Sequence, residues 1–167
     1  MAEGCIYIYT GDGRGKSPAA IGRAVQAAVE GKRVVIIQFL KGNERRELDF
    51  LEELDQLDIK IFRFEKMETC YDQLNEEEQA EEERNILNGL NFARKVIATQ
   101  ECDFLVLDEI LGLLDKHIAT VDMVVGLLKQ KDESMHLILT GNRVDPGILD
   151  YVDSVTTITT LGREQNS

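Results

Sequence analysis

The chain has 167 residues, of which 43% are hydrophobic and 30% are charged. This balance is typical of a globular protein and excludes a disordered chain. A chain of this length can fold around one core without disulfides, so we expect a single domain over residues 1–167. The 19 basic and 31 acidic residues leave a net charge of −12, which argues against binding to nucleic acid or to an anionic membrane surface.

The charge is unevenly distributed along the chain. Residues 1–47 contain 8 basic and 5 acidic residues, whereas residues 48–85 contain 4 and 14. An anionic ligand is therefore expected in the N-terminal third. The three cysteines, Cys5, Cys70 and Cys102, form no paired motif, and no apolar run approaches the 18 or so residues of a membrane span. We expect a cytoplasmic protein with neither zinc nor disulfides.

Short apolar runs alternate with longer helical stretches. The predicted strands are Ile6–Thr10, Val34–Leu40, Ile59–Phe64, Phe104–Asp108, Leu137–Thr140 and Ser154–Thr160. The predicted helices are Lys16–Glu30, Glu44–Leu57, Asn75–Thr99 and Ala119–Lys131. This alternation predicts an α/β fold of P-loop type, with a mostly parallel sheet of about six strands and helices on both faces. Ligands of such sheets bind beyond the carboxyl ends of the strands.

A glycine-rich loop follows the first strand and leads into the first helix. Its residues are Gly11, Asp12, Gly13, Arg14, Gly15, Lys16 and Ser17. Glycines let backbone N–H groups surround phosphate oxygens, and the helix N-terminus adds further donors. Lys16 is predicted to contact the phosphates and Ser17 to bind Mg²⁺. The match to GxxxxGK[ST] is incomplete because Thr10 replaces the first glycine, and the alternative is a tight turn that binds nothing.

The strand Phe104–Asp108 ends in two carboxylates, Asp108 and Glu109. In a phosphate-binding sheet we expect this strand beside the first one, with Asp108 directed toward the metal ion. Glu109 is a candidate for orienting water or substrate. The alternative is a strand that simply ends at exposed acids.

Two basic residues follow other strands, Lys41 after the second and Arg143 after the fifth, and both are candidates for binding the nucleotide. Other polar residues are given structural roles. His117 and His136 are expected on the surface or in packing, and the acidic run Asn75–Arg84 is expected to be a solvated helix face.

Four motifs in order resemble the corrinoid adenosyltransferases that make adenosylcobalamin from ATP. They are YTGDGRGKSPAAIGRAVQAAVEGK, VVIIQFLKG, FLVLDEI and LILTGNRVDPGILDYVDSVTTI, and they extend from Tyr7 to Ile158. The resemblance implies ATP bound at the loop, with Lys16 and Glu109 as catalytic residues and Ser17 and Asp108 at the Mg²⁺. Co(I) of a reduced corrinoid then attacks C5′ of the ribose and releases tripolyphosphate. The resemblance also implies a homodimer.

The sequence departs from that family at three places. Pro18 replaces a loop hydroxyl, no tryptophan occurs, and the sequence ends at TLGREQNS without the family's Lys-His tail. The family's aromatic stretch associated with the corrinoid corresponds to residues 63–74. Two alternatives stay open. One is a repurposed nucleotide-binding relative without corrinoid activity, and the other is a conventional P-loop hydrolase or kinase.

Overall fold

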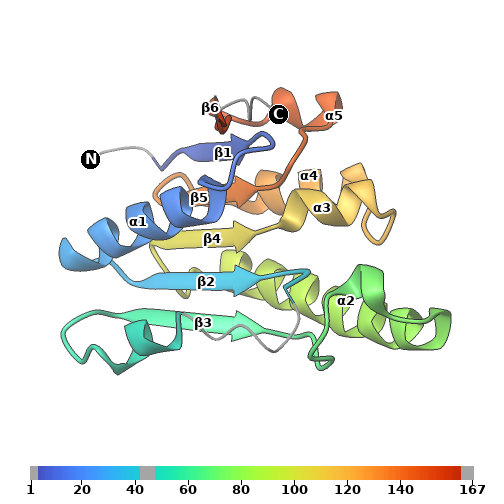
Figure 1. Cartoon of the computed structure of the whole chain (residues 1–167). Helices are drawn as coiled ribbons and strands as arrows, with labels where there is room; N and C mark the ends of the chain where they lie inside the picture. The colour runs from blue at the N-terminus through green and yellow to red at the C-terminus, as the bar shows by residue number, and fades with distance from the viewer. Residues whose placement is uncertain (1–3, 42–47, 163–167) are drawn as a thin grey trace.

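A single six-stranded sheet forms the centre of the molecule (Figure 1). The computed structural model describes residues 4–41 and 48–162. All neighbouring strands are parallel, in the order β3-β2-β4-β5-β1-β6. The strands are β1 (Ile6–Thr10), β2 (Val34–Gln38), β3 (Ile59–Arg63), β4 (Phe104–Asp108), β5 (His136–Thr140) and β6 (Ser154–Thr157). The predicted fold class is confirmed.

The strands differ in burial according to their position in the sheet. Every residue of β2 and β4 is buried, whereas every residue of the edge strand β6 is exposed. This follows from composition, because VVIIQ and FLVLD are suited to a sheet covered on both faces and SVTT is suited to an exposed edge. The second strand ends two residues earlier than predicted, since Leu40 has a left-handed φ of 62°.

Helices cover both faces of the sheet (Figure 1). On one face lies α1 (Lys16–Val29), which buries the small side chains of Ala20, Ala24, Ala27 and Ala28. The other face is covered by α2 (Glu76–Ala98), α3 (Ile110–Asp115), α4 (Val121–Gln130) and α5 (Pro146–Leu149). Alternate residues of each central strand enter these two cores, as the period of two in a strand requires.

The structure corrects one predicted helix and adds two helices that were not predicted. The helix predicted at Glu44–Leu57 falls partly outside the described residues, and the part that is described contains only a 3₁₀ helix, Asp49–Glu53. The helices α3 and α5 were not predicted, because six and four residues are too few to show a helical repeat. A second 3₁₀ helix, Tyr71–Gln73, precedes α2.

The predicted solvated face of α2 is correct except at one residue. Glu82 is 1% exposed, and its carboxylate accepts hydrogen bonds from the backbone N–H groups of Lys66 and Met67 at 3.0 and 3.3 Å. This glutamate anchors the chain that leaves β3 and is not part of the surface.

The expected position of β4 is also wrong. β4 lies between β2 and β5, so β5 separates it from β1. The acidic end of β4 nevertheless reaches the glycine loop, because α1 crosses over the sheet from β1 and packs against β4.

Candidate functional site

The glycine loop joins β1 to α1 and folds around the side chain of its own lysine. Lys16 Nζ donates hydrogen bonds to the carbonyl oxygens of Gly11 and Gly13 at 2.7 and 3.0 Å. The lysine is thereby held at the N-terminus of α1, where a positive helix end and an ammonium group together favour an anion.

The chain that follows β6 packs against the outer side of this loop. The Gly13 N–H donates to the Ile158 carbonyl oxygen at 3.0 Å, and the Arg14 N–H donates to Thr160 Oγ1 at 3.3 Å. A Cβ at Gly11 would lie 2.3 Å from that same carbonyl oxygen, and Gly11 has a φ of +114°. A glycine is therefore required here both by backbone conformation and by the close approach of Ile158.

Four polar side chains end four neighbouring strands and form a connected network. In the strand register Gln38 pairs with Arg63 on one side and with Asp108 on the other. Arg63 Nε donates to Gln38 Oε1 at 2.8 Å, and Gln38 Nε2 donates to Asp108 Oδ2 at 3.2 Å. Thr140 Oγ1 donates to Asp108 Oδ1 at 2.7 Å. The register of the parallel sheet therefore brings these groups to one level at its carboxyl edge.

Asp108 is the centre of this network and is fully buried, with 0% of its side chain exposed. Ser17 Oγ donates to its Oδ1 at 2.8 Å, and Lys41 Nζ lies 2.7 Å from its Oδ2. Burial alone raises the pKa of this carboxyl, but Lys41 and the hydrogen bonds from Lys41, Thr140 and Ser17 outweigh it and hold the pKa below its ordinary value. Asp108 is therefore an anion at neutral pH.

The donor set at Ser17 and Asp108 fits a magnesium ion. Ser17 Oγ and Asp108 Oδ1 are 2.8 Å apart, and the ammonium of Lys41 contacts Ser17 Oγ at 3.0 Å and the other carboxylate oxygen of Asp108, Oδ2, at 2.7 Å. Hard oxygen ligands suit Mg²⁺, which usually takes one or two protein groups and completes its octahedron with water and phosphate. In the part of the chain that the structure describes, no cluster of three or more His, Cys, Asp or Glu side chains could hold a metal by itself.

Glu109 directly follows this aspartate in a strained conformation. Its φ of 67° is left-handed, which is uncommon for a residue with a side chain and occurs often at functional sites. Its N–H donates to Thr140 Oγ1 at 2.7 Å. Burial, and then the charge of Asp108, raise the pKa of the Glu109 carboxyl above its ordinary value.

A cavity of about 910 Å³ opens beside the loop. It is bounded by polar groups of the loop and the strand ends and by apolar groups of α1 and the 48–53 region. Its lining consists of Arg14, Ser17, Pro18, Ile21, Gly22, Gln38, Lys41, Leu48 and Arg63. Of its three basic side chains, Lys41 is paired with Asp108 at 2.7 Å and Arg63 with Asp49 at 3.0 Å, and Arg14 is exposed.

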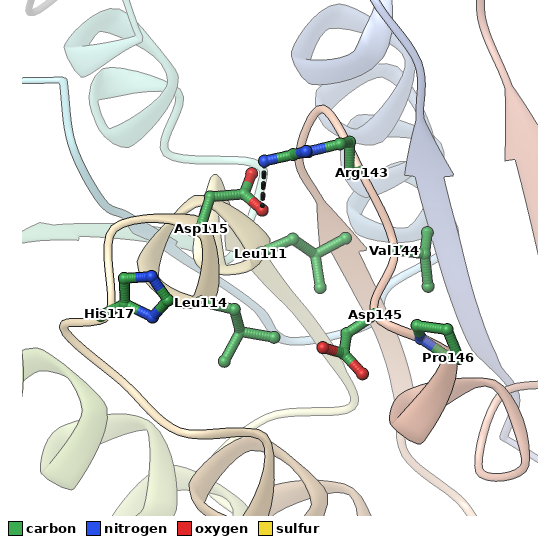
Figure 2. Close-up of a pocket in the computed structure, with 8 residues that line it drawn as sticks. All are labelled: Leu111, Leu114, Asp115, His117, Arg143, Val144, Asp145 and Pro146. Atoms are coloured by element: carbon green, nitrogen blue, oxygen red, sulfur yellow. Dashed lines mark hydrogen bonds and ion pairs between the residues drawn. The ribbon is translucent and has the colours of Figure 1, made fainter.

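Not all the predicted site residues lie together. Asp12 of the loop is exposed, and neither Asp12 nor Arg143 is among the residues that line the large cavity. Figure 2 shows the Arg143 side chain directed toward Asp115 of α3, with 3.4 Å between guanidinium nitrogen and carboxylate oxygen. It lines a separate pocket of about 340 Å³ with Leu111, Leu114, Asp115, His117, Val144, Asp145 and Pro146. The role of Arg143 in nucleotide binding stays a prediction.

Comparison with known proteins identifies the family. The family model for ATP:corrinoid adenosyltransferase BtuR/CobO/CobP matches residues 2–165. The chain belongs to this family. A corrinoid adenosyltransferase of Escherichia coli K12 is 29% identical over 92% of this chain and 76% of its own length. The corrinoid adenosyltransferase CobA of Salmonella typhimurium is 27% identical over the same shares.

Solved structures support the fold independently. A KaiC-like protein of Pyrococcus horikoshii superposes with a TM-score of 0.63 at 20% identity, over 94% of this chain and 72% of its own. At this identity the likeness shows the fold alone. Within the described residues, no helix is long and apolar enough to cross a membrane.

In this chain the two aromatic side chains of the segment that resembles the family's aromatic stretch, Phe64 and Tyr71, both contact α2. The ring of Phe64 lies 5.3 Å from that of Phe92 in α2 in a tilted arrangement, and Tyr71 is 9% exposed, with its hydroxyl 2.5 Å from Glu83. Arg63 is the residue of this stretch that lines the large cavity. Neither Phe64 nor Tyr71 is among the residues that line that cavity.

Three members of the network, Gln38, Arg63 and Thr140, were not singled out from the sequence. Each is the last residue of a strand whose preceding residues are largely apolar. A polar residue that ends a buried strand is the signal that could have found them, because in a parallel sheet such residues share the ligand-binding edge.

Proposed function

We propose that the chain binds MgATP and transfers its 5′-deoxyadenosyl group to the Co(I) of a reduced corrinoid, releasing tripolyphosphate. The observation that carries this proposal is the placement of Ser17, Asp108 and Lys41 against one another beside the glycine loop. Family membership supplies the reaction class, and the geometry supplies a place for a metal–triphosphate group.

The triphosphate is proposed to bind at the N-terminus of α1. Lys16 faces this point and neutralises phosphate charge, while Ser17 and Asp108 hold the Mg²⁺. When bound, that ion neutralises charge that develops on the leaving triphosphate. The nucleoside is proposed to occupy the cavity of about 910 Å³ between α1 and the ends of β2 and β3, which is within the size range of small-ligand sites.

The protein needs no nucleophile of its own for this reaction. The cobalt supplies an electron pair, a Co–C5′ bond forms, and the C5′–O bond breaks with its electrons leaving on tripolyphosphate. The role of the chain is to orient the nucleotide and to stabilise negative charge on the leaving group. Glu109 is proposed to orient the substrate or a bound water, since it is half-buried directly after Asp108.

An anaerobic assay with MgATP and chemically reduced cob(I)alamin tests the proposal. We expect adenosylcobalamin and tripolyphosphate in equal amounts, and neither product with the Lys16→Ala variant. ADP and orthophosphate would indicate a hydrolase or kinase. Bound but intact ATP with unmodified cobalamin would indicate a repurposed nucleotide-binding relative.

We also propose a homodimer, which the family resemblance implies, and a location in the cytoplasm, which the unpaired cysteines favour. Sedimentation equilibrium of the pure protein is expected to give twice the mass of one chain. A monomer at micromolar concentration would contradict the proposed assembly. It would not bear on the proposed reaction, which the product assay tests.

A further inference from the structure

The ammonium group of Lys41 occupies the position at which a metal ion is expected. Its Nζ lies 2.7 Å from Asp108 Oδ2 and 3.0 Å from Ser17 Oγ, and these are the two residues proposed as metal ligands. The lysine is itself partly buried, with 28% of its side chain exposed. An ammonium group held between two oxygen ligands is the closest substitute for a metal cation that a side chain provides.

The hydrogen bonds of the aspartate leave little room for a second cation. Asp108 Oδ1 accepts from Ser17 and Thr140, and Oδ2 accepts from Gln38 and Lys41. A carboxylate has about four acceptor positions, so all of them are in use. A metal ligated by Asp108 must therefore take the place of one of these donors, and Lys41 is the donor that carries charge.

The local charges point to the same conclusion. The negative charge of Asp108 is balanced by Lys41, and Ser17, Gln38 and Thr140 are neutral. The loop lysine, Lys16, is directed toward two carbonyl groups at 2.7 and 3.0 Å. A divalent ion arriving alone finds a carboxylate that is already neutralised. In the low-dielectric interior its binding requires extra negative charge, which phosphate groups can supply.

We propose that Lys41 is the exchangeable counter-ion of the metal site: it prevents a divalent cation from binding without a polyphosphate, and it is displaced when both arrive together. The displaced ammonium then becomes available to phosphate oxygens. This inference rests on the metal and phosphate parts of the proposed function and does not depend on the corrinoid.

The test measures binding of Mn²⁺, a paramagnetic substitute for Mg²⁺. Binding is monitored as the decrease of the EPR signal of free Mn²⁺. Wild-type protein alone is expected to bind Mn²⁺ weakly. Inorganic tripolyphosphate is expected to lower the Kd of the protein for Mn²⁺ at least tenfold, after the Mn²⁺ bound by free tripolyphosphate has been subtracted. The Lys41→Gln variant keeps a hydrogen-bond donor but loses the charge, so it is expected to bind Mn²⁺ alone at least tenfold more tightly than wild type.

Three further variants make the result specific. Lys41→Arg keeps the charge and is expected to behave as wild type. Lys32→Gln removes a surface lysine paired with Glu30 at 3.8 Å and is expected to change nothing. Lys41→Gln combined with Asp108→Asn is expected to lose the gain, which places the ion at Asp108.

The proposal is overturned if folded Lys41→Gln binds Mn²⁺ no more tightly than wild type. It is also overturned if wild-type protein binds Mn²⁺ as tightly without tripolyphosphate as with it. This second measurement does not depend on whether a variant folds. Because no corrinoid is present in this experiment, a failure of adenosyl transfer leaves its outcome unaffected, and the two proposals fail separately.

Discussion

Lys16 is the residue whose removal tests the phosphate site most directly. Its ammonium lies at the N-terminus of α1, bonded to the Gly11 and Gly13 carbonyls. Lys16→Ala removes a charge-assisted phosphate contact of roughly 1.5–3 kcal/mol, so the Kd for MgATP is expected to rise at least tenfold in isothermal titration calorimetry. Lys32→Ala on the surface is the control. Unchanged affinity in a folded Lys16→Ala protein would contradict the loop assignment.

Glu109 gives a prediction about pH. Burial and the charge of Asp108 raise the pKa of this carboxyl in the folded protein, so its ionised form is less stable folded than unfolded. The wild-type protein therefore loses stability as pH rises from the ordinary pKa through the raised one. The side chain of Glu109→Gln cannot ionise. The free energy of unfolding of this variant is therefore expected to equal that of wild type at about pH 4 and to exceed it at about pH 8.

The measurement for Glu109 is urea unfolding of both proteins at the two pH values. Other titrating groups are shared, so the difference between the curves isolates this carboxyl. Glu53→Gln, at an exposed position of the 3₁₀ helix Asp49–Glu53, is the control for the loss of one negative charge. A stability difference for Glu109→Gln that is the same at both pH values would show that its charge is not the cause.

At the scale of elements, α2 has a capping box at its N-terminus. Asn75 Oδ1 accepts from the Glu78 N–H at 2.9 Å, and the Asn75 N–H donates to Glu78 Oε2 at 3.0 Å. Asn75→Ala is expected to cost about 1 kcal/mol of unfolding free energy and to lower Tm by about 2–4 °C. Calorimetry checks this, with the exposed mid-helix Asn88→Ala as control. Equal Tm values for Asn75→Ala and wild type would mean that the cap contributes nothing.

The same elements show what a sequence can and cannot predict. The strands β1 and β4 and the loop between β1 and α1 were predicted at the observed residues, because apolar runs that end at glycine or at an acid are local signals. The pairing of Asp108 with Gln38 and Thr140 was not predicted, since it depends on the order β2-β4-β5 and not on neighbouring letters. Nor was the contact of Gly13 with Ile158, which joins residues 145 positions apart.

At the scale of the whole molecule, the sheet assembles the site from distant parts of the chain. The glycine loop joins β1 to α1, and Asp108 ends β4. The Ile158 carbonyl oxygen, which accepts from the Gly13 N–H, belongs to the segment after β6. Each of these strands ends at the same edge, so a ligand bound there contacts elements that come from distant parts of the chain. We therefore expect ligand binding to stabilise the entire fold and not the loop alone.

Thermal unfolding with and without MgATP measures this coupling. A ligand at about one hundred times its Kd stabilises the folded state by about 2.7 kcal/mol, which for a protein of this size raises Tm by roughly 5–11 °C. Asn75→Ala lowers the starting Tm from the opposite face of the sheet, and because distant sites act independently it is expected to show the full increment. Lys16→Ala is expected to keep its starting Tm near wild type but to lose about half of the increment or more at the same MgATP concentration. An equal increment in all three proteins would mean that MgATP binds elsewhere than at the glycine loop.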